Sequence, residues 1–134
     1  MKKLLKRQEG FTLVEIIIVL VIIAALFAIA IPIYASYVAQ ARSAEAQEAI
    51  NTIWSALKIH NAETNTWASN IQQLKRLEMD QVTRRRWNFS WTTSGRGVSS
   101  ITATSTGLMP GGAGKQVTLN IETGEWRGYG FDTK

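Results

Sequence analysis

The sequence predicts an α+β fold in which a long N-terminal α-helix packs against a small antiparallel β-sheet. Two observations lead to this prediction. The first is an apolar segment of helical length near the N-terminus that continues into an amphipathic pattern. The second is a C-terminal half in which short apolar and polar alternations are separated by turn residues, as is typical of antiparallel strands. Because the chain has 134 residues, we expect one small globular domain beside the apolar segment.

Charge and cysteine content exclude several classes of protein. The net charge is +5, and +3 of it belongs to a leader that contains Lys2, Lys3, Lys6, Arg7 and Glu9. The high isoelectric point is therefore mostly an effect of the leader and does not indicate nucleic-acid binding. The chain has no cysteine, which excludes disulfides, thiolate metal sites and a cysteine nucleophile.

Residues 11–37 form an apolar segment that can span a bilayer. No polar side chain occurs at residues 16–31, and a membrane-spanning helix needs about 20 predominantly apolar residues. The basic leader precedes this segment, so the positive-inside rule keeps the leader in the cytoplasm and places the C-terminal domain outside. A secretory signal peptide cleaved after Ala30 and a plain membrane anchor are the alternatives. Neither explains Glu15, a carboxylate just inside the apolar segment.

The N-terminal sequence resembles that of type IV pilins and the related pseudopilins. KRQEG is followed by FTLVEIIIVLVIIAALFAIAIPIYASYVAQAR, which gives a basic leader ending in Gly10, Phe11 as the first mature residue, Glu15 as the fifth and Pro32 within the apolar helix. The resemblance implies that a prepilin peptidase cleaves between Gly10 and Phe11 and so removes a leader of residues 1–10. The same enzyme would then methylate the new amine of Phe11. An inner-membrane machinery would then assemble the subunits into a homo-oligomeric helical filament on the cell surface.

Glu15 would find a partner in such a filament. An unpaired carboxylate in apolar surroundings costs on the order of a few kcal/mol, whereas an α-amine is cationic at neutral pH. The resemblance implies that Glu15 of one subunit pairs with the Phe11 amine of a neighbour. Pro32 lacks the N–H that would bond to the Ala28 carbonyl, so we expect the helix to kink or loosen there. A tolerated proline without a role in assembly is the alternative for Pro32.

The remaining sequence, residues 38–134, predicts the globular domain. The helix should continue to about residue 61 with an apolar stripe of Ala46, Ile50, Ile53, Trp54 and Leu57. A short helix is expected at residues 70–77, with Ser69 as its cap and Gln72 in the capping-box position.

Four strands are expected after these helices. Alternation predicts strands around residues 87–91, 101–104 and 117–121, and Trp126 opens a return strand after a turn at residues 123–124. The Gly-rich residues 107–115 predict an irregular loop. We expect a four-stranded antiparallel sheet that covers the stripe of the long helix. The C-terminal disulfide that is common in the family is impossible here, so contacts of Trp126, Tyr129 and Phe131 must hold the C-terminal segment.

Little in the sequence suggests catalysis or a metal. His60 is the only histidine, and nothing indicates the orienting partner and nucleophile that a general base needs. Asp80 and Asp132 are the only aspartates, so the calcium loop of the major pseudopilins has no evident counterpart. This favours a pilus subunit over a secretion pseudopilin. We expect a non-enzymatic protein with no cofactor and no metal.

The sequence RRRWNFSW at residues 84–91 allows two interpretations. In a DNA-binding minor pilin, Arg84, Arg85 and Arg86 would grip phosphates, and Trp87 with its aromatic neighbours would stack on bases. In the interpretation that we favour, the aromatic side chains face the sheet core. The arginines then form a solvated turn or pair across a subunit interface.

Overall fold

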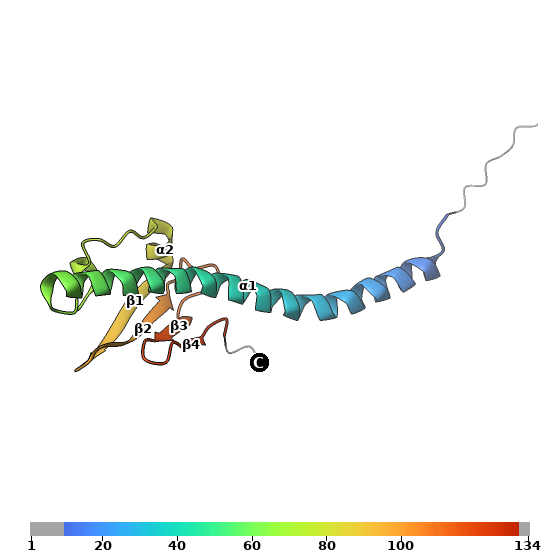
Figure 1. Ribbon diagram of the computed structural model, residues 1–134. Coiled ribbons are helices and arrows are strands. Elements are labelled where there is room, and N and C mark those ends of the chain that lie inside the picture. Colours follow the sequence, from blue (N-terminus) through green and yellow to red (C-terminus); the bar gives the residue numbers. More distant parts are fainter. Residues whose placement is uncertain (1–9, 132–134) are drawn as a thin grey trace, which may run out of the picture. The chain divides into compact units, whose positions relative to one another are not determined.

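The computed structural model describes residues 10–131. Its elements in chain order are α1 (Leu13–Thr64), the 3-10 helix η1 (Ile71–Gln73), α2 (Gln81–Arg86), β1 (Trp87–Ser94), β2 (Gly97–Ser105), β3 (Gln116–Asn120) and β4 (Trp126–Gly128) (Figure 1). The chain divides into two compact units between Ala35 and Ser36. We call residues 10–35 the stalk and residues 36–131 the head, and describe each by itself.

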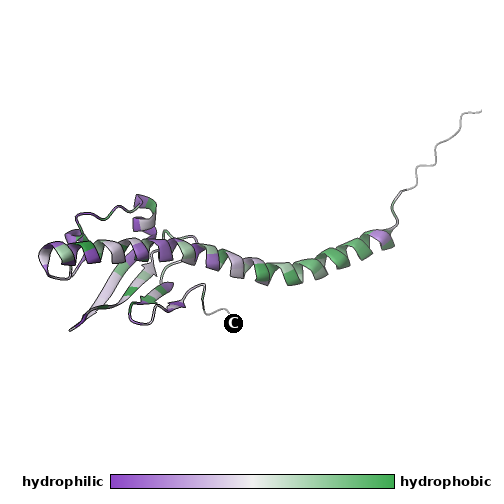
Figure 2. Cartoon of the chain, viewed as in Figure 1, coloured by the Kyte–Doolittle hydropathy of each residue, from purple (hydrophilic) through white to green (hydrophobic). Residues whose placement is uncertain are grey.

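The stalk is one apolar helix whose side chains are exposed in the described part of the chain. Residues 10–35 are all exposed, and every large apolar side chain among them is at least 42% accessible. Figure 2 shows that most residues of this part of the helix are hydrophobic. Helical structure continues through Pro32, so the proline does not end α1. Since a proline within a helix removes one hydrogen bond and crowds the preceding turn, weakening at Pro32 stays a prediction.

The part of α1 that belongs to the head has one buried stripe. The stripe repeats at intervals of three and four residues, which places it on one side of the helix, and consists of Ser43, Ala46, Ala49, Ile50, Ile53, Ala56 and Leu57. The predicted stripe is therefore confirmed, except that Trp54 is half-buried at its edge. The helix itself ends at Thr64, three residues beyond the predicted limit.

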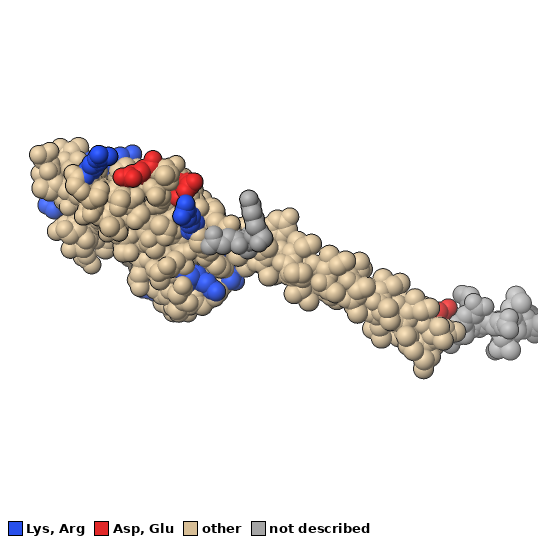
Figure 3. Space-filling model, turned by 90° about the horizontal axis from the view of Figure 1, so that it is seen from below, with Lys and Arg blue, Asp and Glu red and all other residues tan. Residues whose placement is uncertain are grey.

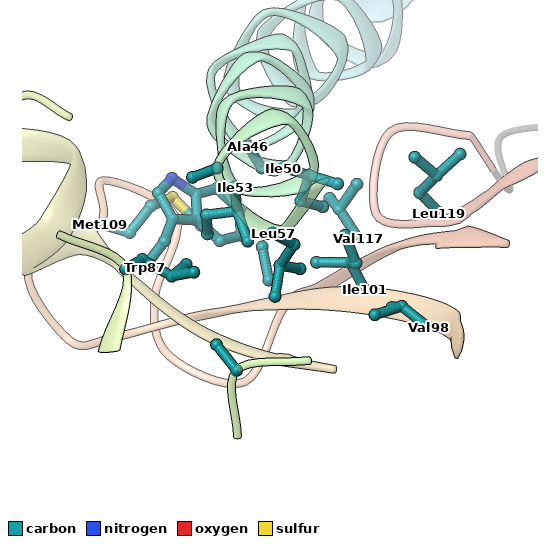
Figure 4. Close-up of a cluster of buried hydrophobic side chains, with 14 residues drawn as sticks. Ala46, Ile50, Ile53, Leu57, Trp87, Val98, Ile101, Met109, Val117 and Leu119 are labelled. Atoms are coloured by element: carbon teal, nitrogen blue, oxygen red, sulfur yellow. The ribbon is translucent and has the colours of Figure 1, made fainter. Parts of the chain in front are cut away.

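The sheet beneath this stripe is a four-stranded antiparallel meander, as predicted, in the order β1-β2-β3-β4. Trp87 of β1, Ile101 of β2 and Val117 of β3 point toward α1 and pack with its apolar stripe (Figure 4). Alternation along each strand places these side chains on one face. The long helix and the small sheet thus form the α+β fold that the sequence predicts, with a single hydrophobic core in the head.

The connection between α1 and the sheet differs from the prediction. The helix expected at residues 70–77 is only the 3-10 turn η1, and its cap is Asn70 rather than Ser69. The Asn70 Oδ1 atom accepts a hydrogen bond from the Gln73 backbone N–H, while Gln73 Oε1 accepts one from the Ser69 backbone N–H. The capping pattern is therefore shifted by one residue. Leu74 leaves the helical path and is buried in the core.

A second short helix, α2, was missed by the sequence analysis. Asp80 begins it, because one carboxylate oxygen accepts hydrogen bonds from the backbone N–H groups of Val82 and Thr83. The β-branched Val82 and Thr83 are weak helix formers, so the sequence around Asp80 does not indicate a helix. The arginines expected in a turn form the last turn of α2 instead.

Glycines fasten the C-terminal segment to the head. Gly128 and Gly130 have φ angles of +99° and +85°, which favour glycine. A Cβ atom at Gly128 would collide with the backbone oxygen of Gln116, and one at Gly130 would collide with the Ser43 side chain of α1. The backbone of this segment therefore lies directly against β3 and α1.

Aromatic contacts complete the fastening of the C-terminal segment, as predicted. The rings of Trp126 and Phe131 stack with centroids 6.1 Å apart, and the Lys115 ammonium lies 5.8 Å from the centre of the Tyr129 ring. The Tyr129 backbone N–H donates to the Gln116 carbonyl at 2.7 Å. The return strand β4 ends at Gly128, so Tyr129 and Phe131 lie beyond it rather than within it.

Candidate assembly site

The beginning of α1 contains a reciprocal pair of hydrogen bonds. The Thr12 backbone N–H donates to Glu15 Oε2 at 2.9 Å, and the Glu15 backbone N–H donates to Thr12 Oγ1 at 3.2 Å. Thr12 precedes the first helical residue, Leu13, so it occupies the N-cap and Glu15 the third helical position. This arrangement is a capping box, in which two otherwise unsatisfied backbone donors are bonded by side chains.

The sequence analysis considered Glu15 only as a charge that needs a partner in another subunit. It missed the role of Glu15 in capping its own helix. The signal was present, since Thr12 followed three residues later by Glu15 matches the capping-box pattern. A carboxylate in the first turn of a helix is also favoured by the helix dipole. Neutral backbone donors stabilise the carboxylate but do not neutralise it, so the cap leaves the charge of Glu15 in place.

Gly10 and Phe11, the predicted processing residues, precede the helix and are exposed. The Phe11 side chain is 86% accessible, and Gly10 has open space where a side chain would be. The peptide bond between them is therefore accessible from outside this chain. The basic leader residues lie outside the described part of the chain.

Within the stalk, Glu15 is the sole charged residue. Figure 3 shows this part of the surface as uncharged apart from one acidic side chain. Residues 16–33 expose an apolar surface on all sides of the helix, which is suited to lipid or to packing among other apolar helices. By length and composition α1 can cross a membrane, although a secretory signal would meet the same test.

Residues 5–31 match the family model of the prokaryotic N-terminal methylation motif. This motif is the class III signal peptide of type IV pilins and pseudopilins. The match covers the N-terminal segment alone, and it supports a type IV pilin-like protein in the broad sense that includes the pseudopilins. The motif implies processing by a prepilin peptidase and assembly by a membrane machinery, and it fits membrane anchoring before assembly.

The second candidate site, at residues 84–87, is divided by the fold. Trp87 is 1% exposed and lies in the core, so it cannot stack on a base. Its indole N–H is buried without a hydrogen-bond partner among the described residues. Arg86 pairs with Glu45 of α1 at 3.3 Å, whereas Arg84 and Arg85 are exposed and form no ion pair within residues 10–131.

Acidic residues lie beside these arginines. Glu45 also accepts a hydrogen bond from the Thr83 hydroxyl at 3.2 Å, which ties α2 to α1. A hollow between α1 and the start of α2 is lined by four carboxylates, those of Glu45, Glu48, Glu78 and Asp80. Acidic and basic side chains lie side by side on one face of the head (Figure 3). A phosphate backbone near Arg84 and Arg85 would therefore also meet a concentration of negative charge.

His60 stands apart from any arrangement suited to catalysis. It is half-buried beside the exposed ion pair of Glu63 and Arg76, near the end of α1. Residues 10–131 contain no group of three histidine, aspartate or glutamate side chains that could hold a metal ion. Asp132 lies outside the described residues.

Proposed function

We propose that this chain is a non-enzymatic structural subunit of a type IV pilus filament. The stalk would be the membrane anchor before assembly and the filament core afterwards. The observation that carries the proposal is the combination of an all-round apolar helix with a single carboxylate at its first turn, in a segment that matches the methylation motif. Lipid and a bundle of identical helices both satisfy such an apolar surface.

Assembly would be guided by the charge on Glu15. Its cap satisfies the helix end but leaves a net negative charge in apolar surroundings, which is costly without a cation. Cleavage after Gly10 creates that cation at the α-amine of Phe11. We propose that Glu15 of one subunit pairs with the Phe11 amine of its neighbour, so that the axial register of the filament is the one that matches these charges.

The first test is the chemical identity of the chain in surface filaments. Filaments are sheared from cells, and the intact mass and N-terminus of this chain are measured. The proposal expects a chain that starts at N-methylated Phe11 within the filament fraction. A chain that starts after Ala30, or that occurs only as soluble protein, would overturn it. Methylated protein that stays in the cell envelope and never enters sheared filaments would identify a secretion pseudopilin instead.

The second test separates the two roles of Glu15. Glu15→Ala removes both the cap and the charge, so it cannot distinguish between them. Glu15→Gln retains an oxygen that accepts from the Thr12 N–H and removes only the charge, while Thr12→Ala removes one half of the cap and retains the charge. If charge pairing governs assembly, Glu15→Gln reduces sheared filaments nearly as strongly as Glu15→Ala.

The Thr12→Ala variant is the matched control for this series. We expect it to assemble at close to the normal level, because an exposed helix cap contributes only about 1 kcal/mol. All three variants should be inserted and cleaved normally, which an immunoblot of membrane fractions checks. Normal filament yield from Glu15→Gln, together with loss of filaments from Thr12→Ala, would mean that the cap rather than the charge is required.

DNA capture through residues 84–87 is the weaker candidate function. It needs exposed aromatic rings next to free cations, but Trp87 is buried, Arg86 is engaged with Glu45, and four carboxylates line a hollow at the start of α2. Steeply salt-dependent DNA binding that is lost in an Arg84→Ala, Arg85→Ala variant would be required to revive it.

A further inference from the structure

A hollow of about 510 Å³ lies in the head at the end where α1 and the turn between β1 and β2 meet. Its walls include the indoles of Trp54 and Trp67, and its apolar floor is made by Val98 and Ile121. Three polar side chains form its rim: Ser94 at the end of β1, Arg96 in the turn that follows it, and Glu122 in the turn after β3. The residues come from four separate parts of the chain, which is why the sequence alone did not indicate the site.

The two indoles are held in place by their surroundings. Their rings stack with centroids 5.9 Å apart and planes 10° from parallel. Gly97 has a φ angle of +128°, and a Cβ atom there would lie 3.2 Å from the Trp67 ring, so a glycine is needed for the indole to rest against this backbone. The Lys58 ammonium lies 5.3 Å from the centre of the Trp54 ring and forms a cation–π contact.

Trp54 and Trp67 differ from the two tryptophans of β1. Trp87 is fully buried, and the Trp91 indole N–H donates to the Ala68 carbonyl at 2.7 Å. Trp54 and Trp67 are only half-buried, and their indole N–H groups make no hydrogen bond within residues 10–131. The hollow is therefore lined by aromatic side chains that are only partly buried.

The rim also has unused hydrogen-bonding capacity. Arg96 and Glu122 are both exposed, and neither forms an ion pair within the described part of the chain, although they border the same hollow. A guanidinium supplies donors, a carboxylate supplies acceptors, and the Ser94 hydroxyl supplies both. Binding pockets for small ligands measure roughly 300–1,000 Å³ and combine apolar walls with a few polar groups of this kind.

We propose that this hollow binds a sugar residue of a neutral polysaccharide. A pyranose ring has apolar C–H faces for the indole walls and a surrounding set of hydroxyls that need both donors and acceptors. The mixed charges of the rim meet that need, whereas the rim has no excess of positive charge to attract the phosphates of a nucleic acid. A purely apolar ligand would leave Arg96 and Glu122 without partners. This proposal does not depend on the filament, because it rests on residues of the head alone.

The test uses the full-length processed protein in a zwitterionic detergent without sugar headgroups. Neutral hexasaccharides of glucose, of galactose and of N-acetylglucosamine are titrated, and binding is followed by tryptophan fluorescence and calorimetry. We expect at least one of them to bind. Arg96→Ala and Glu122→Ala alter exposed side chains and leave the core intact, and each is expected to weaken binding about tenfold, a loss typical of a polar contact in a binding site.

Two further variants complete this design. Trp67→Phe should also weaken binding, whereas Trp126→Phe alters a half-buried indole stacked on Phe131 outside the hollow and should bind like the wild type. Absence of binding to all three hexasaccharides at millimolar concentration overturns the proposal. The proposal is also overturned if the Arg96→Ala and Glu122→Ala variants bind as tightly as the wild type. Tight binding of a single-stranded oligothymidine that Arg96→Ala abolishes would assign the hollow to nucleic acid and overturn the sugar assignment.

Discussion

The two halves of α1 contain similar apolar side chains in opposite surroundings. Ile53 in the head is 0% exposed, whereas Ile22 in the stalk is 54% exposed. Burial of apolar surface contributes about 25 cal/mol per Å², so the head obtains this stabilisation from its own sheet and the stalk obtains none from this chain. In the proposed function, lipid or other copies of the chain would cover the stalk. One continuous helix thus has a part that is buried in the core of the head and a part that is exposed along its whole length.

Charges differ between the two regions in the same way. The head contains acidic and basic side chains that face water or each other, such as Arg86 and Glu45. Among residues 10–35, the stalk contains Glu15 as its one charged side chain. A charge in the head is therefore expected to have a small energetic effect, and the charge in the stalk a large effect on assembly.

The largest effect on the stability of the head is expected from substitution of a buried isoleucine in the head, compared with an exposed isoleucine in the stalk. Ile53→Ala removes buried methyl groups from the core, so it should lower the free energy of unfolding of the head by about 2–5 kcal/mol. Ile22→Ala is the matched control and should leave that value unchanged. All five tryptophans lie in the head, so denaturant unfolding followed by tryptophan fluorescence reports on the head specifically. An equal loss in both variants would refute the division into two regions.

The second largest effect concerns the glycine that fastens the C-terminal segment to α1. Gly130→Ala should destabilise the head by about 2–4 kcal/mol, because it combines a strained backbone with a collision against Ser43. Gly112 has a similar φ angle of +90° and open space around it, so Gly112→Ala should cost only the backbone term of about 1–2 kcal/mol.

Both variants are compared by the same fluorescence measurement. The difference between them isolates the steric contact between Gly130 and Ser43. A Gly130→Ala, Ser43→Gly double variant should recover part of the lost stability, since the collision is with the Ser43 side chain. If Gly112→Ala proved as damaging as Gly130→Ala, the contact with α1 would not be what holds this segment.

The sequence was sufficient for features that repeat or that obey a local rule. Periodicity gave the long helix and its stripe, and alternation gave the four strands, because both patterns follow directly from which side of an element is buried. The elements that were missed or misplaced, α2 and η1, are short and depend on single capping residues, Asp80 and Asn70. Where such a short helix begins depends on which of several neighbouring residues caps it. The amino-acid composition does not show which residue that is.

The candidate site was predicted in part. Gly10, Phe11 and Glu15 could be named because the motif is contiguous, and their roles stay predictions. Thr12 was overlooked although its spacing to Glu15 is a recognised capping signal. The tryptophan hollow could not have been found, because Trp54 and Trp67 are brought to residues of the sheet only by the tertiary fold. Contacts between distant segments leave no local pattern in a single sequence.

A smaller effect is expected from the cap of α2. Asp80→Ala removes the acceptor of two backbone N–H groups and should lower the free energy of unfolding of the head by about 1 kcal/mol. Asp80→Asn retains an accepting oxygen and should cost less, since asparagine is a comparably good cap. The same denaturant titration measures both variants. Equal losses would show that the negative charge of Asp80, rather than its hydrogen bonds, stabilises α2.

The smallest effect is expected from the ion pair between Arg86 and Glu45. The side chains are 35% and 26% exposed and their charged atoms are 3.3 Å apart, so water screens the attraction. A double-mutant cycle with Arg86→Ala and Glu45→Ala should give a coupling free energy of at most about 1 kcal/mol, which decreases as salt is added. A coupling of several kcal/mol that persists in high salt would instead show that charges in the head act as strongly as the charge in the stalk. The contrast between the two regions would then lie in their apolar surfaces alone.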